Sequence, residues 1–170
     1  MKLNKSLLAM LVASSFITVG CENESNLTPD ATTSVEVFYT NANSENVKLN
    51  TGDEITVDAV SELGEIVLDF GGYVVNKSGE QTALYVDAER LYDVTGTIQD
   101  NMCGVSCVGS DGTTKQTFEL NLRAANDVEQ SYHASIINAT AGTYTVIYTF
   151  YCAGDLAHGV TVTVHYRYAV

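Results

Sequence analysis

Apolar and polar residues alternate with a period of two along most of this chain. The alternation is strongest in 144–152, where Tyr, Val, Tyr, Phe and Cys occupy one face and Thr, Ile, Thr and Tyr the other. Successive side chains of a β-strand point to opposite faces of its sheet, so such runs predict half-buried strands. The runs with this pattern are 35–39, 55–59, 66–70, 118–122, 144–152 and 160–168.

Turn-forming residues separate these runs and complete a prediction of about nine strands. The turn signals are Asn50-Thr51-Gly52-Asp53, Gly71-Gly72, Asn76-Lys77-Ser78-Gly79, Ser110-Asp111-Gly112, Ala141-Gly142 and Ala153-Gly154-Asp155. Nine short strands suit an all-β fold in which two antiparallel sheets form a β-sandwich. No stretch of 12 residues has the apolar stripe of a helix, and 86–92 allows at most one helical turn.

The first 20 residues have the pattern of an export signal. Lys2 and Lys5 precede a short apolar run, and Gly20 is a small residue at the expected cut. The apolar run is too short to span a membrane. We therefore expect a signal peptide (1–20), a tether (21–33) and a folded domain (34–170). Residues 22–33 are polar and contain the only proline, as is typical of a flexible tether.

Cleavage directly before Cys21 resembles the processing of bacterial lipoproteins. The resemblance implies that Cys21 becomes the first residue and carries a lipid such as palmitate. The next residues, Glu22-Asn23-Glu24-Ser25, resemble the acidic surface-export tag of Bacteroidetes lipoproteins. This resemblance implies a protein that is lipid-anchored in the outer membrane and faces the cell exterior.

Acidic residues outnumber basic ones by 21 to 8. Loss of Lys2 and Lys5 with the signal takes the formal charge from −13 to −15. Such a surface repels nucleic acid and anionic headgroups, so we expect no nucleic-acid partner and membrane contact only through the lipid. No calcium loop is evident, because Asp87-Ala88-Glu89 lacks the spaced ligands of an EF-hand.

Three cysteines follow Cys21: Cys103, Cys107 and Cys152. In an oxidising compartment a disulfide between Cys103 and Cys107 is the first interpretation. A redox-active pair is less favoured, because such sites use C-x-x-C at the start of a helix, and a zinc site needs four ligands. With an odd number of thiols, Cys152 stays free or pairs with another chain.

Cys152 and His158 also resemble the end of a cupredoxin, in which one strand region delivers Cys and then His to copper. Blue copper uses two His, one Cys and a weak axial Met. His133 and Met102 would have to complete this set, since no Met follows His158. The alternative is that Cys152 is a small buried residue that continues the apolar face of 144–152.

Catalytic signatures are missing from the sequence. It has no Gly-x-Ser-x-Gly elbow and no glycine-rich phosphate loop before a helix. We therefore expect neither enzymatic activity nor a cofactor. Of the ten tyrosines, Tyr151 lies on a polar face and is a surface candidate, whereas five on apolar faces are expected in the core. These five are Tyr39, Tyr144, Tyr148, Tyr166 and Tyr168.

Residues 64–168 contain an ordered series of short elements. They are the strand 66–70 with Asn76-Lys77-Ser78, the pair Cys103 and Cys107, the segment ending at His133, the run 141–148 and the final strand 160–166. This series resembles a secreted all-β domain that recurs in Bacteroidetes cell-surface proteins, often with Ig-like architecture. The resemblance implies export, an Ig-like sandwich and a short-loop disulfide, but no activity. Cys152 departs from the pattern.

The sequence thus predicts a non-enzymatic, lipid-anchored sandwich that serves as a binding, adhesion or structural module. A surface protein or glycan is the expected partner, contacted through a rim formed by 100–111 and 153–159. The ligand and the binding residues are not identified by any motif. The alternative is a cupredoxin-like protein that handles copper or another metal.

Overall fold

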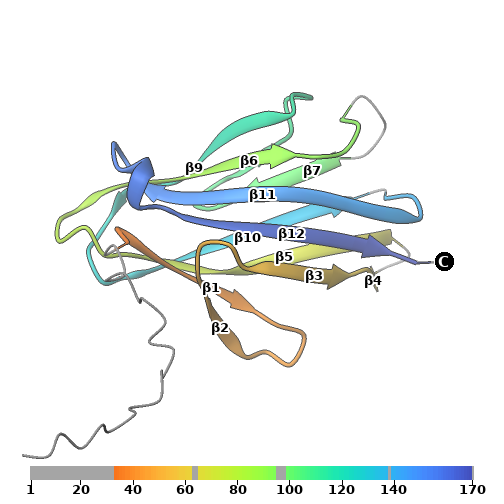
Figure 1. Ribbon diagram of the computed structural model, residues 1–170, viewed down its shortest axis with the longest axis horizontal. Coiled ribbons are helices and arrows are strands. Elements are labelled where there is room, and N and C mark those ends of the chain that lie inside the picture. Colours follow the sequence, from red (N-terminus) through yellow and green to blue (C-terminus); the bar gives the residue numbers. More distant parts are fainter. Residues whose placement is uncertain (1–32, 63–64, 95–98, 138, 170) are drawn as a thin grey trace, which may run out of the picture.

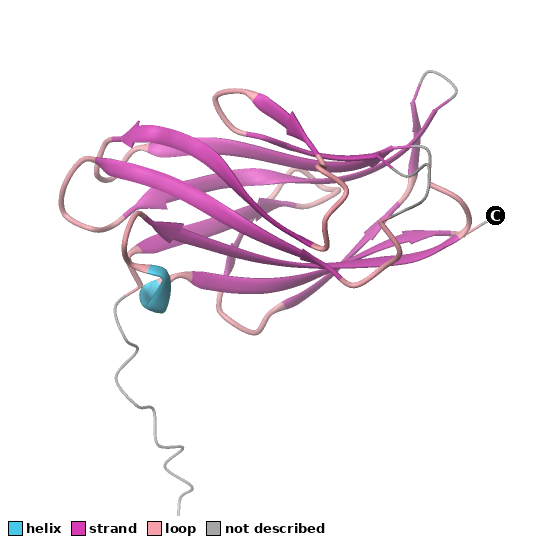
Figure 2. Cartoon of the chain, turned by 90° about the horizontal axis from the view of Figure 1, so that it is seen from above, coloured by secondary structure: helices cyan, strands magenta, loops and turns pink. Residues whose placement is uncertain are grey.

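The computed structural model describes residues 33–62, 65–94, 99–137 and 139–169 (Figure 1). Within these ranges twelve strands form two sheets, and the predicted β-sandwich is confirmed. The short 3-10 turn η1 (Leu156–His158) lies at one end of the sandwich (Figure 2). In this part of the chain no helix is long and apolar enough to cross a membrane. The signal peptide, Cys21 and almost all of the predicted tether lie outside the described residues.

The first sheet has the order β2-β1-β5-β10-β7-β8, and β4 also pairs with β5. Its strands are β1 (Val35–Thr40), β2 (Asn46–Leu49), β4 (Val60–Glu62), β5 (Glu65–Asn76), β7 (Gln99–Cys103), β8 (Cys107–Gly109) and β10 (Glu129–Ile137). All of its neighbouring strands are antiparallel.

The second sheet has the order β3-β12-β11-β6-β9. Its strands are β3 (Glu54–Asp58), β6 (Thr82–Arg90), β9 (Lys115–Ala124), β11 (Gly142–Cys152) and β12 (Val160–Tyr168). One pair departs from the predicted antiparallel arrangement, because β3 runs parallel to β12. Among the strands outside the predicted runs, β2, β4 and β8 are too brief to show a period, whereas β6 and β10 have nine residues each.

The core lies between the two sheets and contains the predicted apolar faces. Every second residue of β11 from Tyr144 to Cys152 is buried, as is every second residue of β12 from Val160 to Tyr166. The hydroxyl groups of Tyr148 and Tyr166 bond to each other at 2.9 Å, and burial raises the pKa of both. Tyr39 and Tyr168 are only partly buried against this core.

Two segments that were predicted as a helical turn and as a turn belong wholly or partly to strands. The segment that allowed a helical turn begins in β6, which pairs with β11 and β9. Its residues alternate between buried and half-exposed because successive side chains of a strand point to opposite faces of the sheet. Gly71-Gly72 lies within β5 and forms no turn. A Cβ atom at Gly72 would lie 1.9 Å from the carbonyl oxygen of Phe38. Glycine therefore allows β1 and β5 to approach closely.

The apolar face predicted for 118–122 is interrupted in β9. Phe118 and Leu120 are buried, but Leu122 is 58% exposed. The pairing of β6 with β9 shifts register on both sides of Leu84, as at a β-bulge. An extra residue in one strand turns the following side chains to the other face, which explains the exposed leucine.

Candidate functional site

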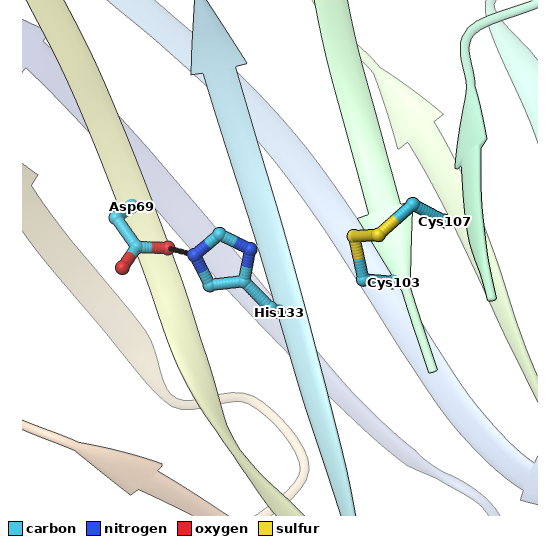
Figure 3. Close-up of a disulfide and its surroundings, with 4 residues drawn as sticks. All are labelled: Asp69, Cys103, Cys107 and His133. Atoms are coloured by element: carbon cyan, nitrogen blue, oxygen red, sulfur yellow. Dashed lines mark ion pairs between the residues drawn. A yellow bond between two sulfur atoms is a disulfide. The ribbon is translucent and has the colours of Figure 1, made fainter. Parts of the chain in front are cut away.

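Cys103 and Cys107 form the predicted disulfide, which closes the β7–β8 hairpin (Figure 3). The turn of this hairpin contacts the edge strand of the other sheet, because the Val105 N–H donates to the Leu120 carbonyl at 3.0 Å. A Cβ atom at Gly104 would lie 2.4 Å from the same carbonyl oxygen. The disulfide therefore holds together a hairpin that links the two sheets.

Replacing both Cys103 and Cys107 by serine is expected to lower the free energy of unfolding by about 2 kcal/mol, because the five-residue loop gains freedom in the unfolded chain. Urea unfolding followed by far-UV circular dichroism measures the change. Reduced wild-type protein is the matched control and should show the same loss. An unchanged midpoint in both samples would contradict a stabilising role for the disulfide.

Cys152 is buried at the end of β11. Its Sγ donates to the carbonyl oxygen of Ser34 at 3.3 Å and lies 3.4 Å from Oδ1 of Asn76. Burial raises the pKa of the thiol, which favours the protonated form over the thiolate that copper binds. Cys152 thus packs as a small core residue, in line with the second interpretation of the sequence.

The four candidate metal ligands are not brought together. His158 lies in η1, is about half exposed and bonds to Asp155 at 2.6 Å. Met102 is buried in β7 of the opposite sheet, and His133 lies in β10. No three His, Cys, Asp or Glu residues in the described ranges are grouped so that they could hold a metal. The cupredoxin-like arrangement is therefore not formed.

His133 instead lies on the outer face of the first sheet. Its Nε2 is 2.5 Å from Oδ1 of Asp69, and both side chains are about half exposed. Gly71 lies beside the ring, and a Cβ atom there would make ordinary van der Waals contact with Cδ2 at 3.5 Å. Figure 3 shows the ring turned towards Asp69 and away from the disulfide.

The two halves of the predicted rim contact the same region of the second sheet through different strands. Residues 99–109 make the β7–β8 hairpin at the side of the first sheet. Asp100 bonds to Arg90 at the end of β6, and the Val105 N–H bonds to Leu120 of β9. The Ala153 N–H bonds to Ala83 near the beginning of β6. A binding role for this rim stays a prediction.

A groove of about 410 Å³ lies instead on the outer face of the second sheet. Strand register places its lining side chains in two rows. The first row, read from β12 to β9, is Thr161, Thr149, Asp87 and Thr117. The second is Ile147, Glu89 and Lys115. Leu156 of η1 also lines the groove and is 53% exposed.

Hydrogen bonds fix the orientation of the polar groups in the groove. Oδ1 of Asp87 accepts from the Thr117 hydroxyl at 2.7 Å and from the Tyr151 hydroxyl at 3.0 Å. The hydroxyl groups of Thr149 and Thr161 bond to each other at 3.0 Å. Lys115 and Glu89 form an ion pair at 3.0 Å. The groove therefore presents hydroxyl and carboxylate groups in fixed positions.

Tyr151 adjoins the groove as part of an aromatic pair. Its ring centroid is 5.9 Å from that of Tyr85, and both rings are half-exposed on the outer face. Burial, and then the bond to Asp87, raise the pKa of Tyr151 to about 12. Its predicted place opposite the buried face of β11 is confirmed.

The groove is lined by carboxylate, ammonium and hydroxyl groups from Asp87, Glu89, Lys115 and three threonines. Ile147 and Leu156 add apolar surface. In the sequence, Asp87 and Glu89 stood out only as part of an incomplete calcium loop. The threonines of β11 and β12 were recognised only as residues on the polar faces of their strands. The groove residues come together because of the order of the strands in the sheet, which the sequence pattern does not give.

No family model matches this sequence, and no curated protein matches it. Among solved structures, the N-terminal domain of PorA is similar, with a TM-score of 0.51 at 15% identity over 79% of this chain and 95% of that one. CfaE, the adhesive subunit of CFA/I fimbria of enterotoxigenic Escherichia coli, gives a TM-score of 0.39 at 8% identity, over 70% of this chain and 46% of that one. The likeness to the PorA domain shows a shared β-sandwich fold.

Proposed function

We propose that this chain is a lipid-anchored module of a Bacteroidetes cell surface that binds a partner and catalyses no reaction. The observation that carries the binding role is the groove on the second sheet, where Asp87 and the threonine hydroxyls are held in place on an exposed face. Ligand sites commonly combine a few oriented polar groups with apolar surface, and Ile147 and Leu156 supply the latter.

The anchoring role is supported by the sequence before the sandwich. A basic and apolar segment ends at Cys21, and β1 begins at Val35. The polar segment between them is long enough to separate the sandwich from a membrane surface. The acidic residues Glu22 and Glu24 support export to the outer face of the cell.

Cells grown with labelled palmitate are expected to incorporate the label into this protein, and Cys21→Ala is expected to abolish the labelling and release the protein from the membrane fraction. Cys152→Ala is the control, since it removes a thiol from the sandwich and should leave labelling intact. Protease added to whole cells should digest the wild-type protein if the module faces outwards. An unlabelled protein with residues 1–20 still attached would contradict the proposal.

A further inference from the structure

We propose that the groove on the outer face of the second sheet binds a neutral saccharide, with Asp87 as the central hydrogen-bond acceptor. This inference rests on the proposed binding function and names the class of ligand. It uses residues that no sequence motif identified.

Asp87 is oriented to accept a hydrogen bond from a ligand hydroxyl group. Thr117 and Tyr151 both donate to Oδ1, which fixes the orientation of the carboxylate. Asp87 is also one of the residues that line the groove. Hydrogen bonds from a hydroxyl to an ionised carboxylate are stronger than those between neutral groups. A sugar hydroxyl would supply such a donor.

The rest of the groove matches the mixed character of a sugar ring. Thr149 and Thr161 carry hydroxyl groups that can both donate and accept, as sugar hydroxyls do. Leu156 and Ile147 offer apolar surface for the C–H face of a ring. Tyr85 and Tyr151 lie beside the first row on the same face, where aromatic rings add apolar area with polar ends. A volume of about 410 Å³ falls within the range of small-ligand sites.

Charge favours a neutral ligand over an ionic one. The chain has a net charge of −13, and the groove itself contains Asp87 and Glu89, so an anionic saccharide would be repelled. A cationic ligand is less favoured, because Lys115 also lines the groove and already pairs with Glu89. The groups left for a ligand are one carboxylate, several hydroxyls and an apolar wall, which together suit an uncharged polyol.

The test is calorimetric titration of the full-length protein, solubilised in detergent. The probes are neutral oligomers of glucose, galactose, mannose and xylose, a sulfated oligosaccharide and a lysine peptide. At least one neutral oligomer is expected to bind. Asp87→Ala and Thr149→Val should each weaken that binding about tenfold or more, since each removes a hydrogen bond to the ligand. Leu156→Asp should also weaken it, and its exposed position makes loss of folding a poor explanation.

Thr143→Val is the matched control. Thr143 lies on β11 and points to the same outer face as Thr149, but it is exposed and pairs with Arg167 away from the groove. This variant should bind like the wild type. Circular dichroism and thermal unfolding of every variant confirm that the sandwich is intact.

Three results would overturn the saccharide site: no neutral oligomer binds, the three groove variants bind as well as the wild type, or the lysine peptide binds and Asp87→Asn abolishes that binding. Palmitate labelling and protease exposure are measured in the same cells. If both are positive while saccharide binding fails, only the groove inference is lost. If Cys21 is unlabelled, the proposed anchoring fails whatever the groove binds.

Discussion

Arg90→Met is expected to lower the free energy of unfolding by about 3–5 kcal/mol, because it leaves a buried carboxylate without its partner. Arg90 ends β6 in the second sheet, and its Nε bonds to Asp100 on β7 of the first sheet. The side chains are 0% and 9% exposed, respectively. Arg90 also donates to the Thr113 carbonyl and to Gln116, both at 3.0 Å. Urea unfolding at neutral pH measures the loss.

Asp100→Leu combined with Arg90→Met is expected to recover much of this loss, because both charges are then absent from the interior. The control for the single variant is Arg167→Met, which breaks a bidentate but exposed pair with Asp58. Exposed ion pairs contribute little, so this control should unfold like the wild type within error. A single Arg90 variant as stable as the wild type would contradict a stabilising role for the buried pair.

Asn76→Ala is expected to lower the free energy of unfolding by about 3 kcal/mol, because it leaves several buried polar groups without partners. Asn76 is fully buried at the end of β5. Its Nδ2 donates to the carbonyl oxygens of Glu80 at 2.7 Å and Ala124 at 2.9 Å, while its Oδ1 accepts from the Ser78 N–H at 2.9 Å. The side chain thus joins β5 to the following loop and to β9.

Asn126→Ala provides the comparison for Asn76. Asn126 forms an isolated β-bridge with Asn76, and its Oδ1 accepts a hydrogen bond from the Gly79 N–H at 2.8 Å. Unlike Asn76, it is only partly buried. Water can replace its bonds, so its loss should be clearly smaller. Thermal and urea unfolding of both variants test this order. Equal losses for the two asparagines would contradict the argument from burial.

The alternation of apolar and polar residues was sufficient to predict the class of fold and many of the core residues. Burial on alternate residues is a property of each strand by itself, so the inward faces of β11 and β12 could be predicted from spacing alone. The prediction failed where contact with a neighbouring strand determines the local structure. Gly72 allows β1 to lie close to β5, and Leu122 faces outwards because of a register shift against β6.

The alternation and spacing of residues therefore predict an all-β chain, most of its buried faces and a pair of cysteines close enough to join. They do not predict that Asp87 bonds to Thr117 and Tyr151, or that Arg90 bonds to Asp100 across the sheets. The fold also buries Cys152 at the end of β11 and leaves His133 half exposed beside Asp69, and no three His, Cys, Asp or Glu residues of the described ranges are grouped as metal ligands. Strand order and register bring distant residues together, and neither can be read from the alternation within a single strand.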